Sequence, residues 1–175
     1  MLTHVIVAVL VLMSSAATVR AQGAPSQLVD KTIQVTFTIG AQAKGADGSN
    51  RFVQRSTTQL IYVSSAGRVF ARELRQYGQR ADSLDRGPDS GTSSGTFRFG
   101  GGKLVGTVQH QSGARQVVVS FDTGFGSCTA NVSVGRDAGR PFVWTGLDGV
   151  SYTATGPVET TSPTCSIRAG NAFGS

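Results

Sequence analysis

The chain is poor in the residues that most often carry chemistry. Its 175 residues include two cysteines, two histidines and one tryptophan, and aromatic residues make up only 7% of the whole. No C-x-x-C pair is present, so the sequence gives no sign of thiol–disulfide exchange chemistry. Two cysteines and the single histidine beyond the N-terminal leader fall short of the four ligands that a structural zinc site needs. We therefore predict no metal and no cofactor.

Catalytic motifs are missing as well. No G-x-S-x-G motif accompanies His110, the histidine beyond the leader. The glycines at 100–102 precede Lys103, but this stretch lacks the first glycine and the closing Ser or Thr of a phosphate-binding loop. Residues 47–50 resemble a fragment of a calcium loop without its further carboxylates. We predict no catalytic residue, and the alternative is a hydrolase with an unrecognised carboxylate or histidine site.

A long apolar run occurs only at the N-terminus. Residues 5–17 are mostly apolar, and Val19-Arg20-Ala21 offers the small residues of a cleavage site, so we predict a signal peptide over residues 1–21. An uncleaved membrane anchor is the alternative, but about 13 apolar residues fall short of the roughly 20 that span a bilayer. No cysteine follows directly, so we expect no lipid anchor. The expected location is the periplasm or the exterior of a bacterial cell.

Export gives the two cysteines a structural role. Cys128 and Cys165 are the two cysteines of the sequence, and cysteines in an oxidising compartment usually form disulfides. Their bond would close a loop of 37 residues, from 128 to 165. Such a closure stabilises a fold by about 4 kcal/mol in the chain-entropy description. We predict a structural disulfide between these two residues.

Basic residues outnumber acidic ones. The 16 Lys and Arg residues, less Arg20 of the leader, leave 15 against 10 Asp and Glu, so the mature chain carries a net charge of +5. A basic surface can attract nucleic acid, anionic lipid or acidic polysaccharide. The interleaved aromatic and basic residues that stack on nucleic-acid bases are missing. We predict a solvated surface of mixed charge, no nucleic-acid partner, no stable membrane insertion and a monomer.

Alternation of apolar and polar residues predicts strands through most of residues 22–175, which we take as a single all-β domain. The clearest run is 31–39, whereas 40–55 and 78–94 are polar and glycine-bearing and predict loops. The spacing in 68–77 fits a strand or a helix, and its β-branched and aromatic residues after a glycine turn favour the strand. About eight or nine strands are expected, forming an up-and-down β-barrel or a β-sandwich.

Residues 104–134 read as three antiparallel strands. A turn at Ser112-Gly113 would place His110 opposite Arg115 and Val108 opposite Val117. Alternation then gives an apolar inner face, made of Leu104, Val108, Val117, Val119 and Phe121. Cys128 in the third strand also points inward, so the disulfide would tie the last strand to this region.

The turn end of this hairpin is the candidate binding site. His110 and Arg115 lie at its predicted rim, and Trp144, the single tryptophan, lines a pocket nearby or belongs to the core. We predict that these three residues bind a small or anionic ligand in a non-catalytic binding or interaction protein. A small outer-membrane β-barrel is a further alternative, but it needs longer strands and more aromatic residues than this sequence has.

Four stretches resemble a set of small exported β-proteins of alphaproteobacteria. They are 62–70 (YVSSAGRVF), 113–122 (GARQVVVSFD), 127–130 (SCTA), and 165–167 (CSI) with Gly170-Asn171. The resemblance covers about a third of the mature chain and rests on turns, strand ends and the cysteine pair. It implies an exported location and a β fold. It transfers no catalytic residue, because no activity is established for that set.

Overall fold

The computed structural model describes residues 23–77, 80–86, 95–110, 113–135, 141–145, 149–161 and 163–174. Most of these residues are in strands, and the two helical segments are single 3-10 turns. In chain order the elements are η1 (Ser26–Leu28), β1 (Lys31–Gly45), β2 (Asn50–Val63), β3 (Val69–Tyr77), β4 (Arg80–Arg86), β5 (Gly95–Gly100), β6 (Lys103–His110), β7 (Gly113–Phe121), β8 (Cys128–Val134), β9 (Val143–Thr145), β10 (Ser151–Ala154), β11 (Glu159–Thr160), β12 (Thr164–Ala169) and η2 (Ala172–Gly174).

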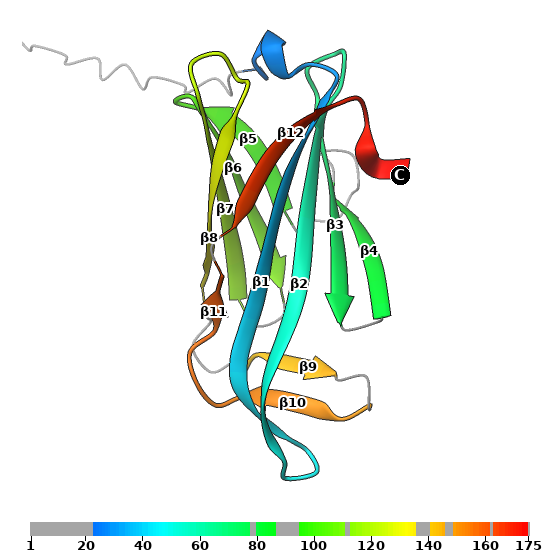
Figure 1. The fold of residues 1–175 in the computed structure, drawn as a ribbon, viewed down its shortest axis with the longest axis vertical. Coiled ribbons are helices and arrows are strands. Elements are labelled where there is room, and N and C mark those ends of the chain that lie inside the picture. The colour runs from blue at the N-terminus through cyan, green and yellow to red at the C-terminus, as the bar shows by residue number, and fades with distance from the viewer. Residues whose placement is uncertain are drawn as a thin grey trace, which may run out of the picture.

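The larger sheet forms around β1. Strand β2 pairs with β1 along its length, and the other edge of β1 is shared by β12, β11 and β10 in turn. Strands β3 and β4 extend this sheet beyond β2, and β9 extends it beyond β10, which gives eight strands. Figure 1 shows β1 and β2 running the length of the molecule, with the β9–β10 hairpin at one end and η1 at the other.

The second sheet has four antiparallel strands in the order β5-β6-β7-β8. It lies behind β1 and β2 in Figure 1, and the two sheets are separate hydrogen-bonded units that do not close into a barrel. The all-β prediction is confirmed, and of its two architectures the sandwich is the one observed. The described residues hold twelve strands, more than the eight or nine predicted, because β4 and the two-residue β11 lie in segments that were expected to be loops.

The core lies between the two sheets. Alternate residues of β1 face it, and each is exposed by 2% or less: Ile33, Val35, Phe37, Ile39, Ala41 and Ala43. Four residues of β6 and β7 face them from the second sheet and are fully buried: Leu104, Val108, Val117 and Val119. The predicted inner face is thereby confirmed, with Phe121 partly buried at its end. Burying each of the larger side chains stabilises the fold by about 1.5–3 kcal/mol.

The β6–β7 register differs from the predicted one by two residues. Val108 pairs with Arg115 instead of Val117, and His110 pairs with Gly113 instead of Arg115. The side-chain period along a strand is two, so a shift of two leaves every side chain on its predicted face. The apolar pattern therefore predicted the inner face of β6 and β7 correctly, but it is equally compatible with both registers.

Two of the predicted loops contain strands. The loop expected at 40–55 is the far half of a long hairpin, in which β1 continues to Gly45 and β2 begins at Asn50. Small residues suit this place because Gly40 lies beneath the ring of Phe52, where a Cβ atom would come within 2.5 Å of the ring. Strand β4 occupies Arg80–Arg86 within the predicted loop 78–94, whose other residues lie outside the described part. Segment 68–77 is mostly strand β3, as predicted.

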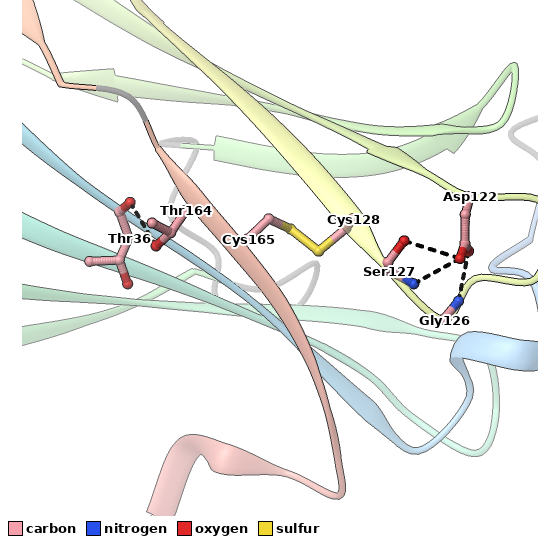
Figure 2. The surroundings of a disulfide bond; sticks show 7 residues. All are labelled: Thr36, Asp122, Gly126, Ser127, Cys128, Thr164 and Cys165. Carbon is pink, nitrogen blue, oxygen red and sulfur yellow. Dashed lines mark hydrogen bonds between the residues drawn. A yellow bond between two sulfur atoms is a disulfide. The ribbon is translucent and has the colours of Figure 1, made fainter.

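The disulfide links the two sheets. Cys128 begins β8 in the smaller sheet and Cys165 lies in β12 of the larger one, with 5.6 Å between their Cα atoms. Figure 2 shows the bond spanning the gap between these two strands. The predicted pairing is confirmed, and no cysteine in the chain is left free. The bond therefore holds the sandwich together along this edge.

Candidate functional site

A pocket of about 300 Å³ lies at the end of the sandwich where η1 is found. This volume is at the lower limit of sites for small organic ligands. Three separate parts of the chain meet there: the segment before η1, the β5–β6 turn and the β7–β8 loop. The lining residues are Gly23, Pro25, Phe99, Gly100, Gly102, Lys103 and Phe125.

The apolar side of the pocket is aromatic. Phe99 and Phe125 line it, and the ring of Phe121 packs against both. The ring centroid of Phe121 lies 6.2 Å from that of Phe99 and 5.3 Å from that of Phe125. Tilted rings at these separations attract each other beyond their apolar burial. The pocket wall is therefore part of a packed cluster that continues into the core, where Phe99 is only 8% exposed.

The loop that presents Phe125 is held by its own hydrogen bonds. The carboxylate of Asp122 accepts bonds from the backbone N–H of Gly126 at 2.7 Å, from the N–H of Ser127 at 3.2 Å and from its hydroxyl at 3.0 Å. These donors, the Gly126 amide first, hold the pKa of Asp122 below its ordinary value. Figure 2 shows that Cys128 follows directly, so the disulfide fixes the same loop at its far end.

The backbone at Phe125 is strained. Its φ of 55° lies in the left-handed region, which bulky side chains rarely occupy. The Phe125 N–H donates to the carbonyl of Asp122 at 3.1 Å, and the carboxylate of Asp122 binds the two residues that follow Phe125. This network outweighs the cost of the unusual conformation, about 1–2 kcal/mol. Strain of this kind occurs most often at functional sites, and here it directs the loop that lines the pocket.

Lys103 is the charged residue among those that line the pocket. It is exposed at the start of β6, and no hydrogen bond or ion pair joins its side chain to the described residues. Gly101 and Gly102 precede it with φ of 58° and 72°, the two positive values of a type I′ hairpin turn. The tight turn fixes the backbone of Lys103 beside the pocket. Asp122 lies three residues before Phe125, and its carboxylate is engaged within its own loop.

The predicted site lies at the other end of the molecule. Lys103 begins β6 and His110 ends it, so the two are separated by roughly 23 Å along the strand. The backbones of His110 and Trp144 belong to β6 and β9, but their side chains fall outside the described part of the structure. Their predicted binding role therefore stays a prediction. Arg115 does not lie at an open rim, because its side chain is only 1% exposed.

Arg115 is instead paired across the interior of the sandwich. Its Nη2 donates to Oε2 of Glu73, whose side chain is fully buried on β3 of the opposite sheet. Its guanidinium also lies 5.1 Å from the centre of the Phe37 ring on β1. Arg75 approaches the other carboxylate oxygen of Glu73 at 4.0 Å. Arg115, which the sequence suggested as a ligand contact, thus forms an ion pair between the two sheets.

More buried polar side chains lie on β2, the strand that pairs with β3. Thr57 and Gln59 on β2 are fully buried, and Gln59 Nε2 donates to the carbonyl of Arg72 at 3.1 Å. Arg55 on the same strand is 8% exposed. Buried polar groups weaken a fold unless they are bonded, but they also restrict how its layers can pack. We interpret this layer as a device that fixes how the two sheets align.

The described residues offer two other observations about function. No group of three or more His, Cys, Asp or Glu among them lies close enough to hold a metal ion. Nor does any helix in this part of the chain have the length and apolar character needed to cross a membrane. Searches of protein-family models, of curated proteins and of solved structures find no match to the chain.

Sequence reasoning missed the pocket. Phe99 and Phe125 each lie next to a glycine, and this context predicted turns and no ligand contacts. The three lining segments are separated by more than 20 residues in each case, so no local pattern connects them. The available signal was the β5–β6 turn itself, which brings a phenylalanine and a lysine to the same end of the sheet.

Proposed function

We propose that this chain is an exported, non-catalytic binding protein that holds a small, largely apolar ligand in the pocket at the η1 end. The observation that carries the proposal is the pocket of about 300 Å³ walled by Phe99 and Phe125. Aromatic side chains supply large apolar contact with few rotatable bonds, so they lose little entropy when a ligand is bound. The disulfide supports the exported location, because such bonds persist in oxidising compartments.

The rigidity of the pocket wall supports binding by a preformed site. The Asp122 network and the disulfide restrict the β7–β8 loop, and the tight turn at Gly101 and Gly102 restricts the β5–β6 connection. A site that is already ordered spends less of its interaction energy on ordering during binding. The lining residues combine aromatic rings, backbone and one cation, a combination that suits recognition of an apolar body.

The test uses N-phenyl-1-naphthylamine, a neutral dye whose fluorescence rises in apolar surroundings. The mature protein should bind the dye saturably with one site per chain. Phe125→Asn removes the aromatic wall while tolerating the left-handed backbone, and should weaken binding about tenfold or more, which is the loss of roughly 1.4 kcal/mol of apolar contact. Phe125→Tyr keeps the ring and should bind within about threefold of the parent.

The matched control is Phe52→Asn, which removes a phenylalanine that is 50% exposed on the β1–β2 hairpin. It should leave dye affinity unchanged. Thermal unfolding of each variant, followed by circular dichroism, verifies that the proteins compared are folded. Absence of saturable binding to the parent protein would refute the proposed function, as would equal affinities for the parent and a folded Phe125→Asn variant.

A further inference from the structure

We infer that the ligand of this pocket is a free apolar acid carrying a single anionic group, and that Lys103 supplies its counter-charge. The inference rests on the proposed function and adds the charge of the ligand to it. It starts from the composition of the pocket lining, which combines two aromatic rings with one cation. An apolar body with an anionic head matches both features.

The charge balance at the pocket favours an anion. Lys103 lines the pocket, and none of the described residues that line it is acidic. The carboxylate nearest to Phe125 along the chain, Asp122, accepts three hydrogen bonds inside its own loop. Lys103 has no hydrogen bond or ion pair with another described side chain, so its ammonium group does not have to leave an existing partner before it meets a ligand.

The side chain of Lys103 is long and flexible, and its backbone is fixed by strand pairing. Its four-carbon side chain carries a compact, strongly hydrated charge that can follow the head group of a ligand. Its backbone is held by pairing with both Gly100 and Ser120. The ligand's apolar body would lie against Phe99 and Phe125 while the anion faces Lys103 and solvent. This arrangement avoids burying an unpaired charge.

The experiment compares two dyes that differ in one group. 8-Anilino-1-naphthalenesulfonate carries a sulfonate, and N-phenyl-1-naphthylamine is the same ring system without it. At low ionic strength the parent protein should bind the sulfonate about three- to fivefold more tightly than the neutral dye, as expected of an ion pair near the surface. The preference should fall as salt is raised to about 1 M, where charges are screened within roughly 3 Å.

Lys103→Gln should remove this preference while leaving the affinity for the neutral dye within twofold of the parent. Lys44→Gln is the matched control, because Lys44 is also exposed and lies near the far end of β1. It changes the net charge equally and should keep the preference. Equal loss in both lysine variants would show a general charge effect and overturn the inference.

The outcomes separate the two proposals. If neither dye binds the parent protein saturably, the proposed function fails and the inference fails with it. If both dyes bind with equal affinity and Lys103→Gln changes neither, the pocket binds apolar ligands without regard to charge. That result would overturn the inference alone. Preferential binding of the sulfonate that depends on Lys103 and not on Lys44 would support both.

Discussion

The ion pair between Glu73 and Arg115 allows a quantitative test of how the two sheets are held together. Both side chains are buried, one from each sheet, and Arg115 Nη2 donates to Glu73 Oε2. Replacing one partner by methionine leaves the other charge in the interior, which should cost about 3–5 kcal/mol of unfolding free energy. Replacing both removes the two desolvated charges together and should cost less than about 1 kcal/mol.

The environment also predicts which single change is milder. Arg75 Nε lies 4.0 Å from the other oxygen of Glu73, so Arg115→Met leaves that carboxylate near a second cation. Glu73→Met removes the carboxylate from Arg115, which then keeps its contact with the Phe37 ring at 5.1 Å. We expect Arg115→Met to be the less destabilising of the two, by about 1 kcal/mol.

Urea unfolding at neutral pH, with the disulfide intact and followed by circular dichroism, gives the four free energies of the cycle. From these single and double costs the expected coupling energy is about 5 kcal/mol or more, above the range of about 0.5–3 kcal/mol found for most neighbouring residues. Lys44→Met, which changes an exposed charge, should shift the unfolding free energy by less than about 0.5 kcal/mol. Two single variants that each cost under about 1 kcal/mol and add in the double variant would refute the reasoning.

Three further predictions concern the frame of the pocket. Replacing Cys128 and Cys165 by alanine opens a loop of 37 residues and should lower the unfolding free energy by about 4 kcal/mol, measured by urea unfolding; an unchanged midpoint would contradict a structural role. Gly106→Ala should lower the unfolding free energy by about 1–3 kcal/mol, because a Cβ atom there would come within 2.2 Å of the Phe97 ring. The control is Gly100→Ala, where an added Cβ atom has nothing within 4 Å. Equal unfolding free energies of the two variants in the same assay would contradict this prediction. The folded-state pKa of Asp122 is lowered, so its contribution to stability is complete above the ordinary value of 3.8 and is lost as pH falls below it. Asp122→Asn should therefore reduce the loss of thermal midpoint between about pH 5 and pH 2, and parallel curves for the two proteins would speak against this network.

The sequence predicted the features that local physics determines. Alternation in residues 31–39 and 104–121 identified the inner faces, and the supply of two cysteines identified the disulfide. These results follow because a side chain's face depends only on its position along a strand, and because two cysteines allow one pairing. The strand at 68–77 was recognised for its β-branched and aromatic residues next to a glycine turn.

Features that depend on tertiary partners were not predicted. The far half of β1 contains glycine and alanine and that of β2 is mostly polar, so both predict a loop until they are paired with each other and β10 is paired with β1. Strand β4, with the sequence RADSLDR, has polar composition and gains its pairing from β3. Arg115 appeared to be a surface charge because its partner, Glu73, lies 42 residues earlier in the chain.

The pocket at the η1 end could not be predicted for the same reason. His110 and Arg115 were predicted as binding residues because their side chains can be charged, whereas the described pocket lining includes phenylalanine, glycine and one lysine. Such residues form a pocket only when the fold brings three distant segments to one end of the sandwich.

The most direct test of the account is to locate a bound ligand. Titration of the ¹⁵N-labelled protein with N-phenyl-1-naphthylamine, followed by amide chemical shifts, reports which residues respond. We predict saturable shifts centred on Gly23, Phe99, Gly102, Lys103 and Phe125, with little change near His110 and Trp144. Shifts centred on His110 and Trp144, or no saturable shifts at all, would contradict the assignment of the pocket as the binding site.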